Sequence, residues 1–222
     1  MNGKTGFLSA GVPPAALLLA AVLLLAGSCR KARQAEESPA EPETEQVLLE
    51  NEEGTSELLE AVEAGDLEKV KALVDAGADI NAPDELGLRA LDAAAWYGHA
   101  RMVAYLIERG AEVNTYGFEA WTPLMAAAKQ GQVESGTVLI AAGADLDAGN
   151  YENWTALMIA AGEGHLEFVR LLIEAGADRE ILNRSGQTAL MIARNNNRKE
   201  VEALLAAGSA QPKATQPSPL PD

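Results

Sequence analysis

The sequence predicts an all-α solenoid, in which short helix-turn-helix units stack side by side and hairpin-like turns connect them. Three sets of residues that recur every thirty-three positions lead to this prediction. The phrase Gly-Ala-Asp or Gly-Ala-Glu begins at Gly77, Gly110, Gly143 and Gly176. Leucine keeps the same step at Leu58, Leu91, Leu124, Leu157 and Leu190. Glycine does so at Gly65, Gly98, Gly131 and Gly164, and Asn197 occupies the next position. A constant period of this length indicates stacked structural units.

A further recurring phrase carries a resemblance to a known family. Thr122-Pro123-Leu124 recurs as Thr155-Ala156-Leu157 and Thr188-Ala189-Leu190. Threonine can cap the first turn of a helix, and proline is tolerated at the first helical position, where its missing N–H is not needed. With Gly-His and Gly-Ala-Asp, these phrases resemble the motif of the ankyrin-repeat family over about 155 of the 222 residues, in five copies. The resemblance implies non-catalytic units of two helices and a hairpin turn that bind other proteins.

Each unit is expected to fold as a pair of short helices. In the fourth unit, the first helix is predicted from Ala156 to Glu163 and the second from Leu166 to Ala175. The second helix carries its apolar residues largely along one stripe, at Leu166, Val169, Leu171, Leu172 and Ile173. The first helix uses small residues such as Ala160 and Ala161, which let neighbouring helices approach closely. Because one pair cannot bury its own apolar face, the core forms by stacking.

The terminal units and one helix of the third unit depart from the pattern. The first unit, from about Ser56 to Ala82, is acidic, as a polar outer cap should be. The last unit replaces Gly-His with Asn197-Arg198. The second helix of the third unit contains Gly136, a poor helix former, between Ser135 and Thr137. From helix propensity we expect Gly136→Ala to stabilise the chain by roughly 0.5–1 kcal/mol.

Residues 1–28 are expected to be a signal peptide of the lipoprotein type. Lys4 precedes an apolar run that is too short to span a membrane comfortably. The run ends in Leu25-Ala26-Gly27-Ser28-Cys29, which resembles the lipobox of bacterial lipoproteins, with Ala26 where leucine is commonest. The resemblance implies that Cys29 becomes the acylated first residue of the mature protein. It further implies a lipid anchor in a bacterial cell envelope, with the protein facing the periplasm or the cell surface.

Cys29 is the only cysteine, so no intramolecular disulfide accounts for it. The alternative is an ordinary signal peptide that is cut after Ser28. Residues 29–54 are rich in glutamate and are expected to form an acidic disordered tether. Residues 55–209 are the expected ankyrin-repeat domain, and residues 210–222 are expected to be a disordered Pro-rich tail.

The charge of the chain restricts the class of partner. The formal net charge is −16, and the repeat region has twice as many Asp and Glu as Lys and Arg. Nucleic acid is therefore not an expected partner, because phosphate binding needs basic patches. An acidic surface attracts a basic partner, although the acidity can also serve only to keep a tethered protein in solution.

No constellation in the sequence indicates catalysis, a metal site or a cofactor. The two histidines, His99 and His165, both occupy the Gly-His position, where the imidazole is expected to bond backbone at the turn between units. The sole cysteine is assigned to lipidation, so no thiol nucleophile remains. Neither zinc-ligand spacing nor a phosphate-binding glycine loop occurs, and Asp145-x-Asp147 lacks the later ligands of a calcium loop. We therefore expect no enzymatic activity.

The family resemblance places binding residues on the hairpin tips and on the concave, exposed face of the first helices. In the second unit these positions include Glu85, Leu86, Leu88, Trp96 and Tyr97. In the third and fourth units they include Phe118, Glu119, Trp121, Tyr151, Glu152, Trp154 and Glu163. Aromatic residues at exposed positions suit a binding hot spot. The hypothesis is a continuous aromatic band across units two to four, with a rim formed by Glu85, Glu119, Glu152 and Glu163.

Two sets of these residues have a structural alternative. Trp121 and Trp154 immediately precede the Thr-x-Leu phrase, where tryptophan can pack across the hairpin onto the next unit. Three methionines that replace the usual motif histidine are expected to serve local packing, namely Met125, Met158 and Met191.

The sequence thus predicts a monomeric, lipid-anchored solenoid that binds an unidentified partner protein by rigid docking. One alternative within binding is an inhibitor or protective partner of a periplasmic enzyme. A different alternative is a glycan or peptidoglycan binder that stacks sugars on Trp96, Trp121 and Trp154.

Overall fold

The computed structural model describes residues 55–208, which lie within one compact unit of the chain. The expected signal peptide, Cys29, the acidic tether and the Pro-rich tail lie outside the described residues. The described part is helical, with no strand, and contains five helix pairs. The first pair is a helix over residues 55–63 with α3 (Leu67–Asp75). The other four pairs are α4 (Ala90–Tyr97) with α5 (Ala100–Glu108), α6 (Pro123–Gln130) with α7 (Val133–Ala141), α8 (Ala156–Glu163) with α9 (Leu166–Ala175), and α10 (Ala189–Asn195) with α11 (Lys199–Gly208).

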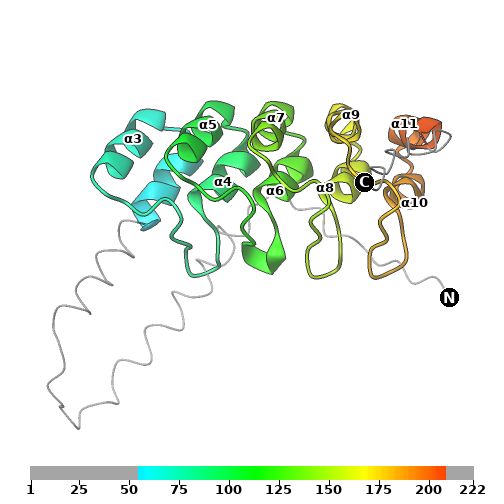
Figure 1. Ribbon diagram of the computed structural model, residues 1–222, viewed down its shortest axis with the longest axis horizontal. Helices are drawn as coiled ribbons and strands as arrows, with labels where there is room; N and C mark the ends of the chain where they lie inside the picture. Colours follow the sequence, from blue (N-terminus) through cyan, green and yellow to red (C-terminus); the bar gives the residue numbers. More distant parts are fainter. Residues whose placement is uncertain (1–54, 209–222) are drawn as a thin grey trace, which may run out of the picture. The chain divides into compact units, whose positions relative to one another are not determined.

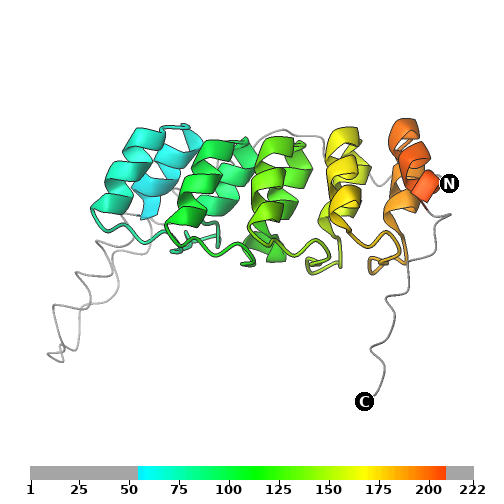
Figure 2. The same ribbon diagram turned by 45° about the horizontal axis from the view of Figure 1, so that its top comes forward.

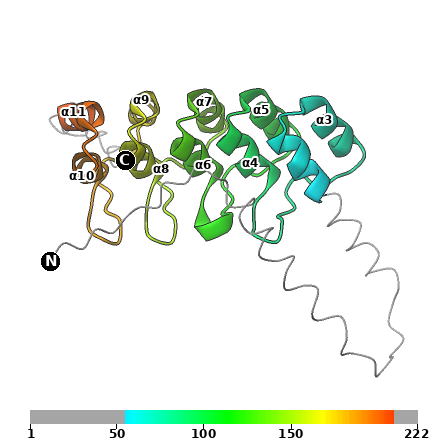
Figure 3. The same cartoon turned by 180° about the vertical axis from the view of Figure 1, so that it is seen from behind.

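The pairs stack into two layers. The first helices, α4, α6, α8 and α10, form one layer, and the second helices, α3, α5, α7, α9 and α11, form the other (Figure 1). The view from behind has the same order (Figure 3), and the tilted view shows the second helices side by side (Figure 2). The loops that enter each first helix project away from the second-helix layer (Figure 1). The predicted all-α solenoid is therefore confirmed.

Capping residues explain why the first helices begin and end where they do. The Thr155 hydroxyl accepts a hydrogen bond from the Met158 amide at 3.4 Å, and Thr122 and Thr188 cap their helices in the same way. At the other end Gly164 has a φ of 88°, a left-handed conformation that glycine adopts without steric cost. Asn197 takes this role in the last pair, with a φ of 57°. The predicted bounds of α8 and α9 agree with the structure.

The core lies between the layers and runs through the whole stack. The first helices contribute small residues that are fully buried, including Ala94, Ala127, Ala160 and Ala193. The second helices contribute large ones, including Met102, Leu139 and Leu172. In α9 the predicted apolar stripe omitted Phe168, whose side chain is fully buried. None of the helices between residues 55 and 208 has the length and apolar character that crossing a membrane requires.

Gly136 has a packing role that the sequence did not reveal. It is buried in α7, and a Cβ atom added to it would lie 2.6 Å from the Phe168 ring and 3.3 Å from Leu171. Real Cβ atoms do not approach other atoms so closely. The expectation that Gly136→Ala would be stabilising is therefore wrong, because steric contact across the stack outweighs helix propensity. The small residues Ser135 and Gly136 in α7 leave room for the large ring of Phe168 in α9.

Candidate partner-binding surface

Four loops that connect the helix pairs form a row on one side of the stack (Figure 1). They are loop 1 (residues 79–88), loop 2 (112–121), loop 3 (145–154) and loop 4 (178–187), and together they are called the loop row. In loop 3 the Asn150 side-chain oxygen accepts hydrogen bonds from the amides of Glu152 and Trp154, at 3.0 and 2.9 Å. Asp84 and Asn183 close loops 1 and 4 in the same way. These bonds fix the conformation of the tips of loops 1, 3 and 4.

Side chains also join each loop to the next. Asn81 donates to the Gly110 carbonyl at 3.1 Å and accepts from the Glu112 amide at 3.0 Å. Asn114, one repeat later, makes the same two bonds to loop 3 and its preceding turn. Asp147 follows in the series and accepts from the Asp178 amide at 2.8 Å, but a carboxylate has no N–H to donate. Loops 3 and 4 are joined in addition by the Asn153 side chain, which donates to the Leu182 carbonyl at 2.7 Å, and by the Arg184 amide, which donates to the Glu152 carbonyl at 3.0 Å. The loop row is therefore held as one surface.

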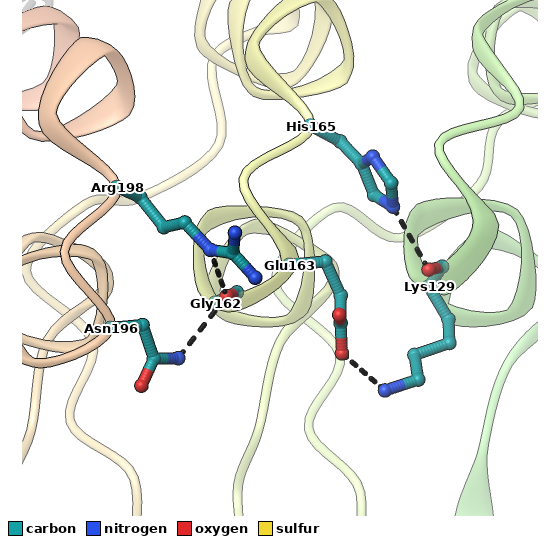
Figure 4. A network of polar contacts seen from close by, with 6 residues as sticks. All are labelled: Lys129, Gly162, Glu163, His165, Asn196 and Arg198. Atoms are coloured by element: carbon teal, nitrogen blue, oxygen red, sulfur yellow. Dashed lines mark hydrogen bonds and ion pairs between the residues drawn. The ribbon is translucent and has the colours of Figure 1, made fainter. Parts of the chain in front are cut away.

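A second series of bonds joins the ends of the first helices (Figure 4). The His165 ring nitrogen Nε2 lies 3.0 Å from the Lys129 carbonyl oxygen. Gln132 and Arg198 occupy the same position in their units and donate to the carbonyls of Trp96 and Gly162, at 3.4 and 3.0 Å. The expected structural role is thus confirmed for His165.

The expected hydrogen bond to the backbone is not formed by His99. Its Nε2 atom is buried without a hydrogen-bond partner, and its ring stacks on Tyr97 with the centroids 6.0 Å apart. Ring stacking thus takes the place of the bond that the other three side chains make. Burial also raises the pKa of the Tyr97 hydroxyl, with a further contribution from the nearby Glu63 carboxylate.

The predicted surface residues divide into two groups by exposure. Phe118 and Tyr151 are exposed on the tips of loops 2 and 3, at 39% and 67%. Leu86 and Tyr97 are half-buried. The remaining apolar members are half-buried and pack against the core, namely Leu88, Trp96, Trp121 and Trp154. The tryptophans therefore present only part of their surface, and the exposed aromatic area is at the loop tips.

Three exposed apolar side chains were absent from the predicted surface. Tyr116 and Leu182, at 55% and 52% exposed, occupy the same position of loops 2 and 4, one residue before the position whose side chain closes the tip in loops 1, 3 and 4. That shared position, rather than residue type, is the signal that could have identified them. Met191 is 47% exposed because no further helix pair within residues 55–208 covers it, whereas Met125 and Met158 are fully buried as expected.

The acidic residues of the predicted rim also differ from one another. Glu85, Glu119 and Glu152 are exposed on loops 1, 2 and 3. Glu163, on α8, instead forms an ion pair with Lys129 on α6 (Figure 4). Its charge is therefore balanced locally and contributes little to an acidic rim.

The loop row has an uneven distribution of charge. Loops 1 to 3 contain eight Asp and Glu and no Lys or Arg, whereas loop 4 contains Arg179 and Arg184. Within residues 55–208, none of those eight carboxylates takes part in an ion pair. Their negative potential is therefore available to a partner.

Loop 2 has an unusual backbone. Gly117 replaces the side chain that closes the other loops, and residues Phe118–Ala120 form a single 3-10 turn, η1. Glu119 and Ala120 have positive φ angles of 55° and 58°, which residues other than glycine and asparagine rarely adopt. The neighbouring structure therefore holds the tip that carries Phe118 in a conformation it would not favour alone.

The base of loop 2 is held by Arg89, at the start of α4. The Arg89 guanidinium donates to the Tyr116 carbonyl at 3.3 Å and to the Asn81 carbonyl at 3.1 Å, so it joins loops 1 and 2. Arg89 stands where the later units have the capping threonine, and Asp92 instead accepts from the Arg89 amide at 3.0 Å.

Asp92 is a buried carboxyl group with incomplete hydrogen bonding. Its side chain is 4% exposed, and its second oxygen has no hydrogen-bond partner. Burial raises the pKa of Asp92 from 3.8 to about 7, although its hydrogen bond from the Arg89 amide and the Arg89 charge act in the opposite direction.

In the part of the chain that the structure describes, no group of three His, Cys, Asp or Glu side chains could hold a metal ion.

Comparison with known proteins supports the repeat assignment. A family model described as ankyrin repeats (3 copies) matches residues 37–117, 58–150 and 124–216, which together span more than half of the chain. No curated protein matches the chain.

Proposed function

Because the chain belongs to the ankyrin-repeat family, whose repeats form protein–protein interaction modules, we propose that it binds one partner protein through the loop row. One observation carries the proposal, namely three exposed aromatic side chains, Tyr116, Phe118 and Tyr151, on neighbouring loops. Large aromatic rings in contact with water can lose much exposed area on binding, and such residues dominate the energetics of interfaces.

The geometry of the loops favours docking without rearrangement. The tips are closed by Asp84, Asn150 and Asn183, and the loops are joined by Asn81 and Asn114. A surface that is already ordered loses little conformational entropy when a partner binds. The proposed recognition is therefore rigid docking, without rearrangement of the loops.

The half-buried tryptophans favour a protein partner over a glycan. Trp96, Trp121 and Trp154 pack against the core, so each has only part of its ring surface available to stack on a sugar. Tyr151, the most exposed of the large hydrophobic side chains described, lies instead at a loop tip.

Affinity capture from native cell extract tests this function. The bait is the full chain, compared with a Phe118→Ala/Tyr151→Ala variant and with Met191→Ala, which removes an exposed apolar side chain away from the loops. We expect one protein to be captured by the unaltered chain and by Met191→Ala, and to be lost with the double variant. Equal capture by all three baits would refute a site on the loop row.

We also propose that the module is lipid-anchored through Cys29 in a bacterial cell envelope. The support is in the sequence, where the only cysteine follows Leu25-Ala26-Gly27-Ser28 at the end of an apolar run. Cys29→Ala should move the protein from the membrane fraction to the soluble fraction and abolish incorporation of labelled fatty acid. Unchanged fractionation and labelling would contradict the anchor.

A further inference from the structure

Phe118 with Glu119 and Tyr151 with Glu152 form two aromatic–acidic pairs, in two successive repeats. The two pairs occupy the same positions of loops 2 and 3, thirty-three residues apart. All four side chains are exposed. An aromatic face attracts a cation through its ring electrons, and a carboxylate beside it attracts the same cation by charge. Each pair is thus suited to one lysine or arginine side chain of a partner.

The surroundings of the two pairs reinforce this preference. Loops 1 to 3 contain no Lys or Arg, and none of their carboxylates is in an ion pair within residues 55–208. In loop 1 the aromatic position is taken by Glu85, which offers a carboxylate alone. In loop 4 it is taken by Arg184, which would repel a cation. The series of cation-binding positions therefore runs from loop 1 to loop 3 and does not continue into loop 4.

The spacing of the pairs limits the conformation of the bound segment. The first helices pack side by side, and packed helices lie about 8–10 Å apart, so the loops that enter them follow one another at about that interval. A polyproline-type chain has three residues per turn and advances about 3.1 Å per residue. Residues three apart therefore lie about 9 Å apart on one face of such a chain, which matches the repeat.

We infer that the loop row binds an extended basic segment of the partner, with arginine or lysine at every third residue. The inference rests on the proposed function and specifies the chemistry of the partner. Cationic side chains at successive third positions contact Glu85, then Phe118 with Glu119, then Tyr151 with Glu152. Closing side chains hold the tips of loops 1 and 3, and the bonds of Asn81 and Asn114 join loop 2 to both of its neighbours, which keeps these positions in register.

A peptide titration tests the spacing directly. The probe is a fluorescein-labelled, proline-rich decapeptide with three arginines at every third position, titrated with the full chain at low salt and followed by fluorescence anisotropy. The matched probe has the same composition with its three arginines adjacent. We expect the spaced peptide to bind roughly tenfold more tightly than the matched one. Equal binding of the two peptides, or no binding of either, would overturn the inference.

Variants of the chain separate the recurring pairs from net charge. Glu119→Gln/Glu152→Gln removes both carboxylates of the pairs and should weaken the spaced peptide roughly tenfold. Glu134→Gln/Glu167→Gln removes the same charge from exposed positions one repeat apart on α7 and α9, and should change binding less than twofold. Equal weakening by both double variants would mean that only overall acidity attracts the peptide, and would overturn the inference.

The outcome also distinguishes the inference from the proposed function. If capture of a partner depends on Phe118 and Tyr151 while neither peptide binds, the loop row is a binding surface and the basic segment is wrong. If capture does not depend on them, the proposed site fails, and the inference that depends on it fails as well.

Discussion

Replacing Asp92 by asparagine should change how the stability of the chain depends on pH. The folded chain keeps Asp92 protonated up to about pH 7, because burial raises its pKa from 3.8 to about 7. The unfolded chain releases that proton near pH 4. Between these two values the folded state binds more protons than the unfolded state, so stability falls as the pH rises. Above pH 7 the folded chain must hold a buried carboxylate that has one oxygen without a partner.

The size of this effect on the free energy of unfolding follows from the pKa shift of Asp92. A change of about three units corresponds to about 4 kcal/mol, because each unit is worth about 1.4 kcal/mol. Arg89 and Asp84 are the charged groups that act on Asp92, the first lowering and the second raising its pKa. Asparagine retains an oxygen for the Arg89 amide but leaves its N–H groups without an acceptor, at a cost of about 1–3 kcal/mol. Asp92→Asn should therefore be more stable than the unaltered chain at pH 8 by roughly 1–3 kcal/mol, and should lose that advantage at pH 5.

Urea unfolding at pH 5 and pH 8, followed by circular dichroism, measures this difference. Glu108→Gln, which removes an exposed carboxylate from the end of α5, is the matched control. The pKa of Glu63 is also raised by burial and by repulsion from Glu60 and Asp84, so some pH dependence of the same sign should remain in the variant. If Asp92→Asn and the unaltered chain lose stability in parallel between pH 5 and pH 8, the reasoning about Asp92 is refuted.

Three further changes test packing and the bonds between units. Gly136→Ala should destabilise the chain by roughly 1–3 kcal/mol, and Phe168→Leu in the same chain should recover part of the loss; a higher thermal midpoint for Gly136→Ala would contradict the contact. Asp147→Asn should gain about 0.5–1.5 kcal/mol in urea unfolding by supplying the missing donor to the Gly176 carbonyl, and no gain would mean that the new amide does not reach that carbonyl. Arg198→Ala should lose about 0.5–1.5 kcal/mol while Arg198→Gln retains stability, because Gln132 makes the equivalent bond; equal losses would show that the guanidinium is itself required.

The fold could be predicted because its signals are local and repeated. Thr155 and Gly164 mark the two ends of α8 by their own conformational preferences, and the same signals recur in the neighbouring units. Gly136 could not be interpreted in this way. The effect of Gly136 on stability depends on its contact with Phe168, thirty-two residues away, and helix propensity does not take that contact into account.

The candidate surface was predicted in part, for a similar reason. The repeat pattern placed Phe118 and Tyr151 at loop tips, and both are exposed. Residue type alone did not distinguish them from Trp96, whose ring packs against the core, nor did it reveal Tyr116. His99 and His165 share one position of the motif but differ in hydrogen bonding, since only the ring of His99 stacks on an aromatic neighbour, Tyr97.

The bonds between loops 3 and 4 affect how the stack comes apart. In a linear array each unit is held only by its neighbours, so opening begins at a unit that has a neighbour on one side only. The last pair, α10 and α11, packs on α8 and α9 and has no described helix pair on its other side. Its amides should therefore exchange with deuterium before those of α6 and α8. Loop 4 enters α10 and is bonded to the tip of loop 3 through the Arg184 amide and the Asn153 side chain, so fraying of the last pair would also loosen the part of the recognition surface that carries Tyr151 and Glu152.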